Sequence, residues 1–310
     1  MLRFLYFGLP LGALLLAADG FEPALAVLSP VEAPGARRLR RRLGARVLDA
    51  RTTTPEALES EVDTRLRELD LDLLVSWYWT RRLPKRWLER PRLGAIGAHP
   101  SLLPRHRGPD PFFWAIDSGD DETGVSMHFL TEGYDEGPVI VAESLDIGDR
   151  NAWELARALD RPSLRLLRET VRRFAVGSPP RSTPQDERRA TWAPAPEGDL
   201  LRVDFRWTTE RVLRRIRALG PVPGVPLEIH GVRFTVARAE AARDFPLALA
   251  PGEAAVTETG VAVRTGDGAI RITRATVENA FEPDDVEVVD ARGLSRALLI
   301  TELRAAGSGP

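Results

Sequence analysis

The sequence predicts an α/β protein. Its N-terminal part should hold a Rossmann-like, mainly parallel sheet, and its C-terminal part a small, OB-like β-barrel. Short apolar runs alternate with helical segments up to residue 175, as in parallel strands covered by helices on both faces. Beyond residue 200, short strand-like runs follow one another with turn residues between them, which is typical of a small barrel.

The first elements are predicted from an apolar N-terminus that allows two interpretations. Residues 1–18 could be a signal peptide, because an apolar run at 4–16 follows Met1-Leu-Arg and the small residues Ala17-Ala18 come after it. They could also form a strand at 2–7, a turn at Gly8-Leu9-Pro10 and a helix at 11–18, followed by a strand at 24–28. Pro10 inside the segment favours the strand and helix. No other segment approaches the ~20 apolar residues that cross a bilayer, so no membrane partner is predicted.

An arginine-rich segment follows at residues 34–44. Its composition fits either a phosphate-binding or RNA-binding segment or a charged surface helix. Leu39 and Leu43 are four residues apart, which is the spacing of one buried stripe on a short helix. The spacing favours the surface helix.

Caps and breakers predict the remaining elements of the N-terminal part. Thr54 is the predicted N-cap of a helix at 55–69. Asn151 and Glu154 have the spacing of a capping box that opens a helix at 152–159. Pro162 suits the first turn of a separate helix at 163–175. We further expect strands at 47–48, 71–79, 96–99, 124–130 and 139–144, and a helix at 111–118.

The domain organisation follows from a proline-rich stretch with few aliphatic residues. The predicted domains are a catalytic domain at 1–177, a linker at 178–199, a β-barrel domain at 200–305 and a flexible tail at 306–310. In the barrel domain we expect a helix at 208–219, a hairpin around His230-Gly231, strands near 254–263 and 269–277, and a last helix at 294–305.

Composition limits the function classes. A chain of 310 residues with 43% hydrophobic content can form a full core in each of two domains. The net charge of −2 gives no global reason to expect nucleic acid or an anionic membrane as a partner. The sequence has no cysteine, which excludes disulfides and thiol nucleophiles and fits a cytoplasmic protein. Four scattered histidines do not predict a metal site.

His99 is the first candidate functional residue. Pro100 and Pro104 prevent a helix after the apolar run that begins at Ile96, so His99 should end a strand. In open parallel sheets, ligands bind beyond the carboxyl ends of the strands, and those ends carry Gly8, residues 77–80 and His99. A histidine there can transfer protons near neutral pH.

The stretch 94–137 contains an ordered series of motifs. These are His99-Pro100-Ser101-Leu102-Leu103-Pro104, Arg107-Gly108, Pro111, Trp114-Ala115-Ile116, Thr123-Gly124-Val125-Ser126 and Gly133-Tyr134-Asp135-Glu136-Gly137. Together they resemble the signature of the formyltransferases that use N10-formyltetrahydrofolate. That family includes methionyl-tRNA, glycinamide ribonucleotide and sugar N-formyltransferases.

The resemblance implies transfer of a formyl group from N10-formyltetrahydrofolate to an amine. The attack creates an oxyanion that needs hydrogen-bond donors, and protons must leave the amine and reach the departing nitrogen. By motif, His99 would be the oxyanion donor and proton shuttle, with Asp135 as its partner. The implied folate-binding residues are Trp79, Leu83, Pro84, Ser101, Leu102, Leu103, Pro104 and Tyr134. The aromatic residues 77–79 are equally compatible with core packing, and His106, His128 and His230 are expected to be loop or sheet-face residues.

The chain departs from the family's pattern at Gly97, where the family has a catalytic Asn. The only asparagines are Asn151 and Asn279, and neither lies in the motif region. Loss of one oxyanion donor typically costs ~2.7 to 4 kcal/mol. Beside formyl transfer, two alternatives therefore stay open. One is hydrolysis of the formyl donor or another specialised biosynthetic reaction, and the other is a non-catalytic folate-binding homologue.

The acceptor is predicted from two signals that disagree. Residues 216–224 resemble the C-terminal domain of methionyl-tRNA formyltransferase. Tight RNA binding, however, requires clustered basic residues, and residues 200–310 contain 15 Arg against 15 Asp plus Glu. This balance favours a small-molecule amine, such as an amino sugar or an amino-acid derivative, over tRNA. The barrel would then serve in substrate shaping or in a homodimer.

Overall fold

The computed structural model describes residues 2–229, 231–278, 286–296 and 298. Its chain divides into two compact units. The first comprises Met1–Pro111, Thr123–Leu145 and Arg157–Pro194, and the second Phe112–Glu122, Asp146–Ala156 and Ala195–Pro310. The domain boundaries that the sequence predicts stay a prediction.

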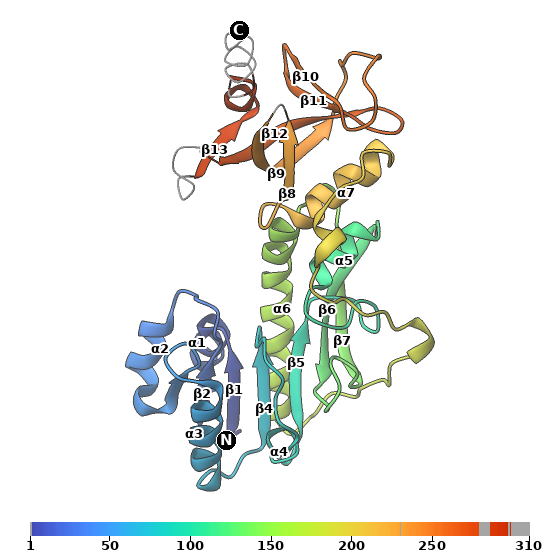
Figure 1. Cartoon of the computed structure of the whole chain (residues 1–310). Helices are drawn as coiled ribbons and strands as arrows, with labels where there is room; N and C mark the ends of the chain where they lie inside the picture. The colour runs from blue at the N-terminus through green and yellow to red at the C-terminus, as the bar shows by residue number, and fades with distance from the viewer. Residues whose placement is uncertain (1, 230, 279–285, 297, 299–310) are drawn as a thin grey trace. The chain divides into compact units, whose positions relative to one another are not determined.

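The main sheet has seven strands in the order β3-β2-β1-β4-β5-β6-β7 (Figure 1). Strands β1 to β5 pair in parallel, and β6 pairs antiparallel to β5. This confirms the predicted mainly parallel, Rossmann-like sheet. The strands are β1 Phe4–Gly8, β2 Leu25–Leu28, β3 Val47–Asp49, β4 Leu73–Trp77, β5 Ala95–His99, β6 Glu122–Phe129 and β7 Val139–Asp146.

Helices connect these strands. They are α1 Pro10–Ala18, α2 Ala36–Leu43, α3 Pro55–Arg67, α4 Lys85–Leu88, α5 Pro111–Asp117 and α6 Ala152–Ala175. The Thr54 hydroxyl accepts a hydrogen bond from the Ala57 N–H at 3.3 Å, which confirms the predicted N-cap of α3. In the part of the chain that the structure describes, no helix has both the length and the apolar character needed to cross a membrane.

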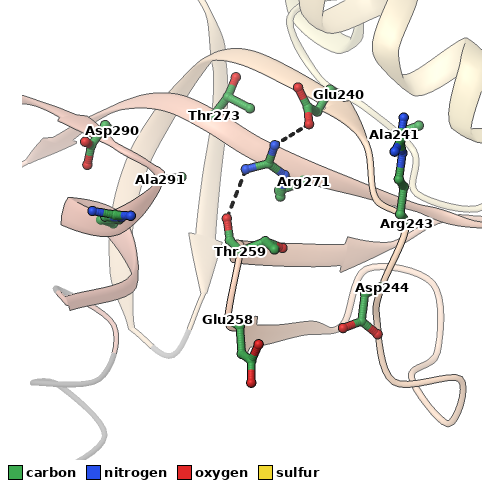
Figure 2. Close-up of a pocket in the computed structure, with 11 residues that line it drawn as sticks. Glu240, Ala241, Arg243, Asp244, Glu258, Thr259, Arg271, Thr273, Asp290 and Ala291 are labelled. Carbon is green, nitrogen blue, oxygen red and sulfur yellow. Dashed lines mark hydrogen bonds and ion pairs between the residues drawn. The ribbon is translucent and has the colours of Figure 1, made fainter.

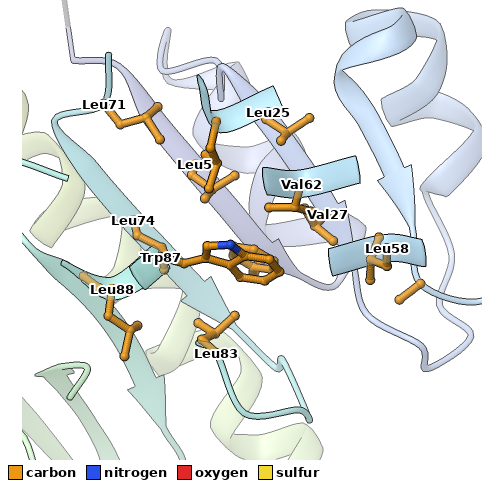
Figure 3. Packing of buried hydrophobic residues seen from close by; sticks show 14 residues of the cluster. Leu5, Leu25, Val27, Leu58, Val62, Leu71, Leu74, Leu83, Trp87 and Leu88 are labelled. Atoms are coloured by element: carbon orange, nitrogen blue, oxygen red, sulfur yellow. The ribbon is translucent and has the colours of Figure 1, made fainter. Parts of the chain in front are cut away.

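One face of the sheet packs against α3 and α4 (Figure 3). The ring of Trp87 stacks on Phe7 with 5.4 Å between centroids. Leu58, Val62 and Leu66 present one stripe of α3 to the sheet, and burying each contributes ~1.5–3 kcal/mol. The buried cluster contains Leu5, Phe7, Leu25, Val27, Ala50, Leu58, Val62, Leu66, Leu71, Leu74, Leu83, Trp87, Leu88 and Ala95.

The opposite face packs against α1 and α6, so helices cover both faces. A Cβ on Gly12 of α1 would lie 2.3 Å from the Tyr6 hydroxyl, which shows how closely α1 approaches β1. The Trp77 indole donates a hydrogen bond of 2.5 Å to the Ser163 hydroxyl of α6. Gly8 has φ of 142°, and a Cβ there would lie 1.7 Å from the Trp77 carbonyl oxygen. Only glycine allows the carboxyl ends of β1 and β4 to come this close.

The prediction of a helix break at Pro162 is wrong, because α6 is one helix with Pro162 inside it. A proline in a helix interior removes one backbone hydrogen bond and costs ~3 kcal/mol. Burial of Leu159, Leu167 and Val171 on the continuous helix offsets this cost. The capping box is confirmed, since the Asn151 and Glu154 side chains each accept from the other's N–H.

The second unit contains a curled antiparallel sheet, in the order β10-β11-β12-β9-β8 with β13 beside β12. Its elements are α7 Thr209–Leu219, β8 Val225–Ile229, β9 Val232–Ala241, β10 Ala254–Thr257, β11 Gly260–Arg264, β12 Ala269–Glu278 and β13 Val286–Asp290. This sheet is the predicted small barrel in half-open form, and β13 was not predicted. His230, most of the predicted last helix at 294–305 and the predicted tail lie outside the described residues.

A buried ion cluster joins α5 to α7 within the second unit. The Asp117 carboxylate accepts from Arg211 at 2.6 and 2.9 Å and from Arg215 at 2.7 and 3.0 Å. Arg215 also donates to the carbonyl oxygens of Leu200 and Arg202. Buried charges are tolerated only when paired and fully hydrogen-bonded, and this arrangement meets that condition.

Candidate active site

The site begins with the register between β5 and β6. Gly97 lies opposite His128, and His99 lies opposite Ser126. Directly opposed residues of an antiparallel pair project from the same face, and alternate residues of a strand share a face. These four positions therefore lie on one face near the carboxyl end of β5.

Ser126 fixes the loop that follows His99. Its hydroxyl donates to the Ser101 carbonyl oxygen at 2.8 Å and accepts from the Leu103 N–H at 3.0 Å. The Ser101 hydroxyl donates in turn to the Arg105 carbonyl oxygen at 2.6 Å. Ser101 therefore forms its hydrogen bond within the loop after His99. This loop turns sharply and brings His106 back toward His99.

His99, Asp135 and His128 come together, and we call these three side chains the histidine-carboxylate cluster. Asp135 Oδ2 lies 3.3 Å from His99 Nδ1, and Oδ1 lies 3.5 Å from His128 Nε2. The Gly108 N–H donates to Oδ2 at 2.9 Å. The side chains of His99 and His128 are 7% and 1% exposed, and that of Asp135 is 18% exposed. The cluster is therefore largely shielded from solvent, and Asp135 is its most exposed member.

The other ring nitrogens determine where the protons lie. His99 Nε2 is 2.7 Å from the His106 carbonyl oxygen, and His128 Nδ1 is 2.9 Å from that of Phe129. Because a carbonyl oxygen only accepts, both of these nitrogens carry a proton. In neutral rings, the two nitrogens facing Asp135 would then have lone pairs, and an ionised carboxylate could bond to neither. A His99–Asp135 hydrogen bond therefore requires one further proton in the cluster.

His128 does not hold that further proton at neutral pH. Burial lowers the pKa of His128 to about 4, although the nearby Asp135 carboxylate acts in the opposite direction. The Asp135 carboxylate lies closer to His99 than to His128. The cluster therefore places one carboxylate between two imidazole rings, of which His128 is neutral at neutral pH.

Gly97 leaves no open space for a larger side chain. A Cβ added at Gly97 would lie 2.8 Å from Cδ2 of Leu130, a half-buried residue that packs against the core. A Leu130 methyl therefore fills the position from which an asparagine side chain would start. This contact could not be anticipated from the sequence, because Gly97 and Leu130 belong to segments that are distant in the chain.

The residues predicted to bind folate have different surroundings. Leu83 and Ser101 are buried, and Pro84 precedes α4. The ring of Trp79 packs edge-on against Phe7 at 5.0 Å. Tyr134 is 50% exposed and lies beside Trp192 with 6.0 Å between ring centroids. Leu102, Leu103 and Pro104 are half-buried in the loop after His99.

Two buried donors lie unpaired in the segment after β4. Across the described part of the first unit, Trp79 Nε1 and Arg81 Nη1 are the buried side-chain nitrogens that lack a hydrogen-bond partner. An unsatisfied buried donor costs ~1–3 kcal/mol, so a pair of them two residues apart calls for an acceptor. The sequence predicts a folate contact for the aromatic ring of Trp79, but not for its N–H. It predicts no folate contact for Arg81.

The second unit contains a separate pocket of about 670 Å³ (Figure 2). Arg271 bonds there to Glu240 and to the Thr259 carbonyl oxygen. Acidic and basic side chains occur in nearly equal number, and no residue predicted for the site lines this pocket. The lining residues are Glu240, Ala241, Arg243, Asp244, Glu258, Thr259, Arg271, Thr273, Asp290, Ala291 and Arg292. Within the described ranges, no group of three His, Asp or Glu side chains is arranged to hold a metal ion.

Comparison with known proteins gives a consistent result. A family model described as formyl transferase matches residues 24–161, and one described as formyl transferase, C-terminal domain, matches residues 199–281. The methionyl-tRNA formyltransferase of Halorhodospira halophila is 33% identical over 241 residues, which cover 77% of each chain. That of Sorangium cellulosum is 35% identical over 234 residues, which cover 74% of each chain.

Two solved structures have a similar fold. HypX from Aquifex aeolicus in complex with tetrahydrofolic acid has a TM-score of 0.66 and 23% identity, over 96% of this chain and 47% of HypX. An N-formyltransferase from Helicobacter canadensis, in complex with folinic acid and dTDP-3-aminofucose, has a TM-score of 0.66 and 15% identity, over 88% and 99%. At these identities the likeness concerns the fold.

The lowered pKa of His128 makes stability depend on pH. The unfolded chain takes up this proton near pH 6.5, and the folded chain only near pH 4. The free energy of unfolding should therefore fall as the pH drops from about 6.5 to 4, by up to ~1.4 kcal/mol per pH unit from this group. Urea unfolding across this range, compared with His128→Gln, measures the contribution. The same pH dependence in both proteins would contradict it.

Proposed function

The chain belongs to the formyl transferase family, and on this premise we propose that it transfers a formyl group from N10-formyltetrahydrofolate to an amine. Its relatives in this family are enzymes. The histidine-carboxylate cluster carries the proposal, because it places a carboxylate between two imidazole rings at the carboxyl end of β5.

The folate supplies the formyl carbon and the nitrogen that departs. The amine nitrogen forms a bond to the formyl carbon, the bond from that carbon to N10 breaks, and one proton moves from the amine to the departing nitrogen. In our proposal, His99 donates from Nε2 to the formyl oxygen, exchanging its bond to His106 for this one. Asp135 keeps His99 protonated while negative charge develops. His128 remains neutral beside the carboxylate, because burial disfavours its charged form.

The folate would lie along the segment after β4 and the loop after β5. The unpaired donors Trp79 Nε1 and Arg81 Nη1 fit a ligand rich in carbonyl and carboxylate oxygens, which supports this assignment. The proposed binding residues remain those of the sequence analysis, namely Trp79, Leu83, Pro84, Ser101, Leu102, Leu103, Pro104 and Tyr134.

For the acceptor, we propose a small-molecule amine in preference to tRNA. The Arg-rich helix α2 is a packed helix, since Leu39 and Leu43 are buried. Arg40 binds Asp49 at 2.5 Å, and Arg42 binds Glu22 at 2.8 Å, so part of its charge is already paired. The balanced charge of residues 200–310 supports the same choice. The methionyl-tRNA formyltransferases among its relatives make tRNA the competing acceptor.

The surroundings of Gly97 bear on the alternatives to transfer. Gly97 supplies no amide to the formyl oxygen, and Leu130 makes that side of the site apolar. Transfer to an amine is then left with His99 as its main oxyanion donor. If the remaining oxyanion stabilisation is too weak for any turnover, the protein has a non-catalytic folate-binding role.

An assay with the donor alone and with acceptors separates these functions. The purified protein is mixed with N10-formyltetrahydrofolate, and the release of tetrahydrofolate is followed by its absorbance. We expect turnover when an amino-sugar nucleotide or an amino-acid amine is added, and little with initiator methionyl-tRNA. Turnover without any amine would establish hydrolysis instead. Binding of 5-formyltetrahydrofolate without turnover in any mixture would establish the non-catalytic role.

The contact between Gly97 and Leu130 predicts how the missing donor can be restored. Gly97→Asn alone should give little gain, because its Cβ meets Leu130. The double variant Gly97→Asn/Leu130→Ala makes room for the amide and should raise kcat, with an upper limit on the order of 10²- to 10³-fold. Leu130→Ala alone is the control. If the double variant is no faster than this control, an amide at position 97 does not serve the reaction of this chain.

A further inference from the structure

The proline-rich stretch, residues 178–194, is fastened to both loops of the site. Val139 and Thr183 exchange two backbone hydrogen bonds of 2.8 Å. The Arg107 N–H donates to the Thr191 carbonyl oxygen at 2.9 Å, and the Ala193 N–H donates to that of Arg107 at 2.7 Å. The stretch is thus anchored twice, and Gln185 lies between the two anchors.

The amide of Gln185 is fully used by these two loops. Its Nε2 donates to the carbonyl oxygens of Asp135 and Gly137, both at 2.7 Å. Its Oε1 accepts from Arg107, at 3.0 Å from Nε and 2.8 Å from Nη2. Two acceptors on one side and a guanidinium on the other determine the amide orientation, since the reversed amide would satisfy none of them.

The loop that Gln185 holds has a conformation that needs support. Asp135 has φ of 56°, in the left-handed region, which costs a residue with a side chain ~1–2 kcal/mol. This conformation turns the carboxylate to the Gly108 N–H and to the two histidines. The Gln185 amide bonds to the backbone of Asp135 and to Arg107. Arg107 directly precedes Gly108, whose N–H donates to the Asp135 carboxylate.

We propose that Gln185 is a positioning residue that keeps the Asp135 carboxylate between His99 and His128. The inference rests on the proposed formyl transfer for its kinetic consequence, and on the geometry alone for its effect on the cluster. Gln185 acts through Asp135 and does not itself contact the histidines. Loss of its two N–H donors should release the left-handed loop and lengthen the contact between Asp135 and His99.

The chain offers a pair of variants that separates this role from simple fastening of the stretch. Gln185→Glu keeps an acceptor for Arg107 but sets a carboxylate oxygen against the carbonyl oxygens of Asp135 and Gly137. Glu187→Gln weakens the ion pair with Arg107, at 2.7 Å, and leaves the Gln185 amide in place. Gln185→Met, of similar volume and without charge, serves if the glutamate variant does not fold.

The first readout needs no turnover. In protein labelled with ¹⁵N-histidine, Gln185→Glu should shift the ring nitrogen signals of His99 and increase hydrogen exchange of residues 133–138, and Glu187→Gln should do neither. Equal effects of the two variants would overturn the proposal. This comparison stands even if the protein transfers no formyl group.

The second readout is kinetic and uses N10-formyltetrahydrofolate with the amine found in the acceptor assay, or alone if the donor is hydrolysed. Gln185→Glu should lower kcat on the order of 10- to 100-fold with little change in KM for the folate, because a misplaced catalytic group slows the chemical step and leaves ground-state binding intact. The pH profile of kcat should change with it. Wild-type kcat in Gln185→Glu, or an equal loss in Glu187→Gln, would refute the positioning role.

Discussion

The carboxylate of Asp135 lies between two imidazole rings, each of which already donates one proton to a backbone carbonyl. The position of these three side chains depends on several elements of the first unit. The β5–β6 register must place His99 and His128 on one face, and the loop of Asp135 must be held in a left-handed turn. The buried core under β1, β4 and β5 forms a rigid frame that maintains the 3.3 Å separation between His99 Nδ1 and Asp135 Oδ2.

The site combines features that the sequence reveals with features that depend on long-range packing. His99 and Asp135 belong to an ordered local series, and the alternation of strands and helices predicts the sheet that carries them. His128 was predicted to be a loop or sheet-face residue, and it lies in β6 opposite Gly97. Its contact with Asp135 depends on the antiparallel register with Gly97 and on the path of a later loop, which no local pattern specifies.

Other differences have similar physical causes. Pro162 indicated a helix break because local propensity opposes proline in a helix, yet burial along α6 outweighs it. Proline-rich composition predicts a linker at residues 178–199, but it does not say where the backbone groups of this stretch find partners. Residues 178–194 find them in the loops around His99 and Asp135, so this stretch helps to hold the histidine-carboxylate cluster. At Gly97 a methyl group of Leu130 lies where a side chain would begin, and this contact also depends on long-range packing.

The substitution Asp135→Asn tests the central claim most directly. Asparagine tolerates the left-handed turn and keeps an oxygen for the Gly108 N–H, but it removes the negative charge between the two rings. Calorimetry with 5-formyltetrahydrofolate should show unchanged binding, and release of tetrahydrofolate from the N10-formyl donor should slow on the order of 10²- to 10⁴-fold. Wild-type turnover in this variant would show that the histidine-carboxylate cluster is not where the proton of the reaction is handled.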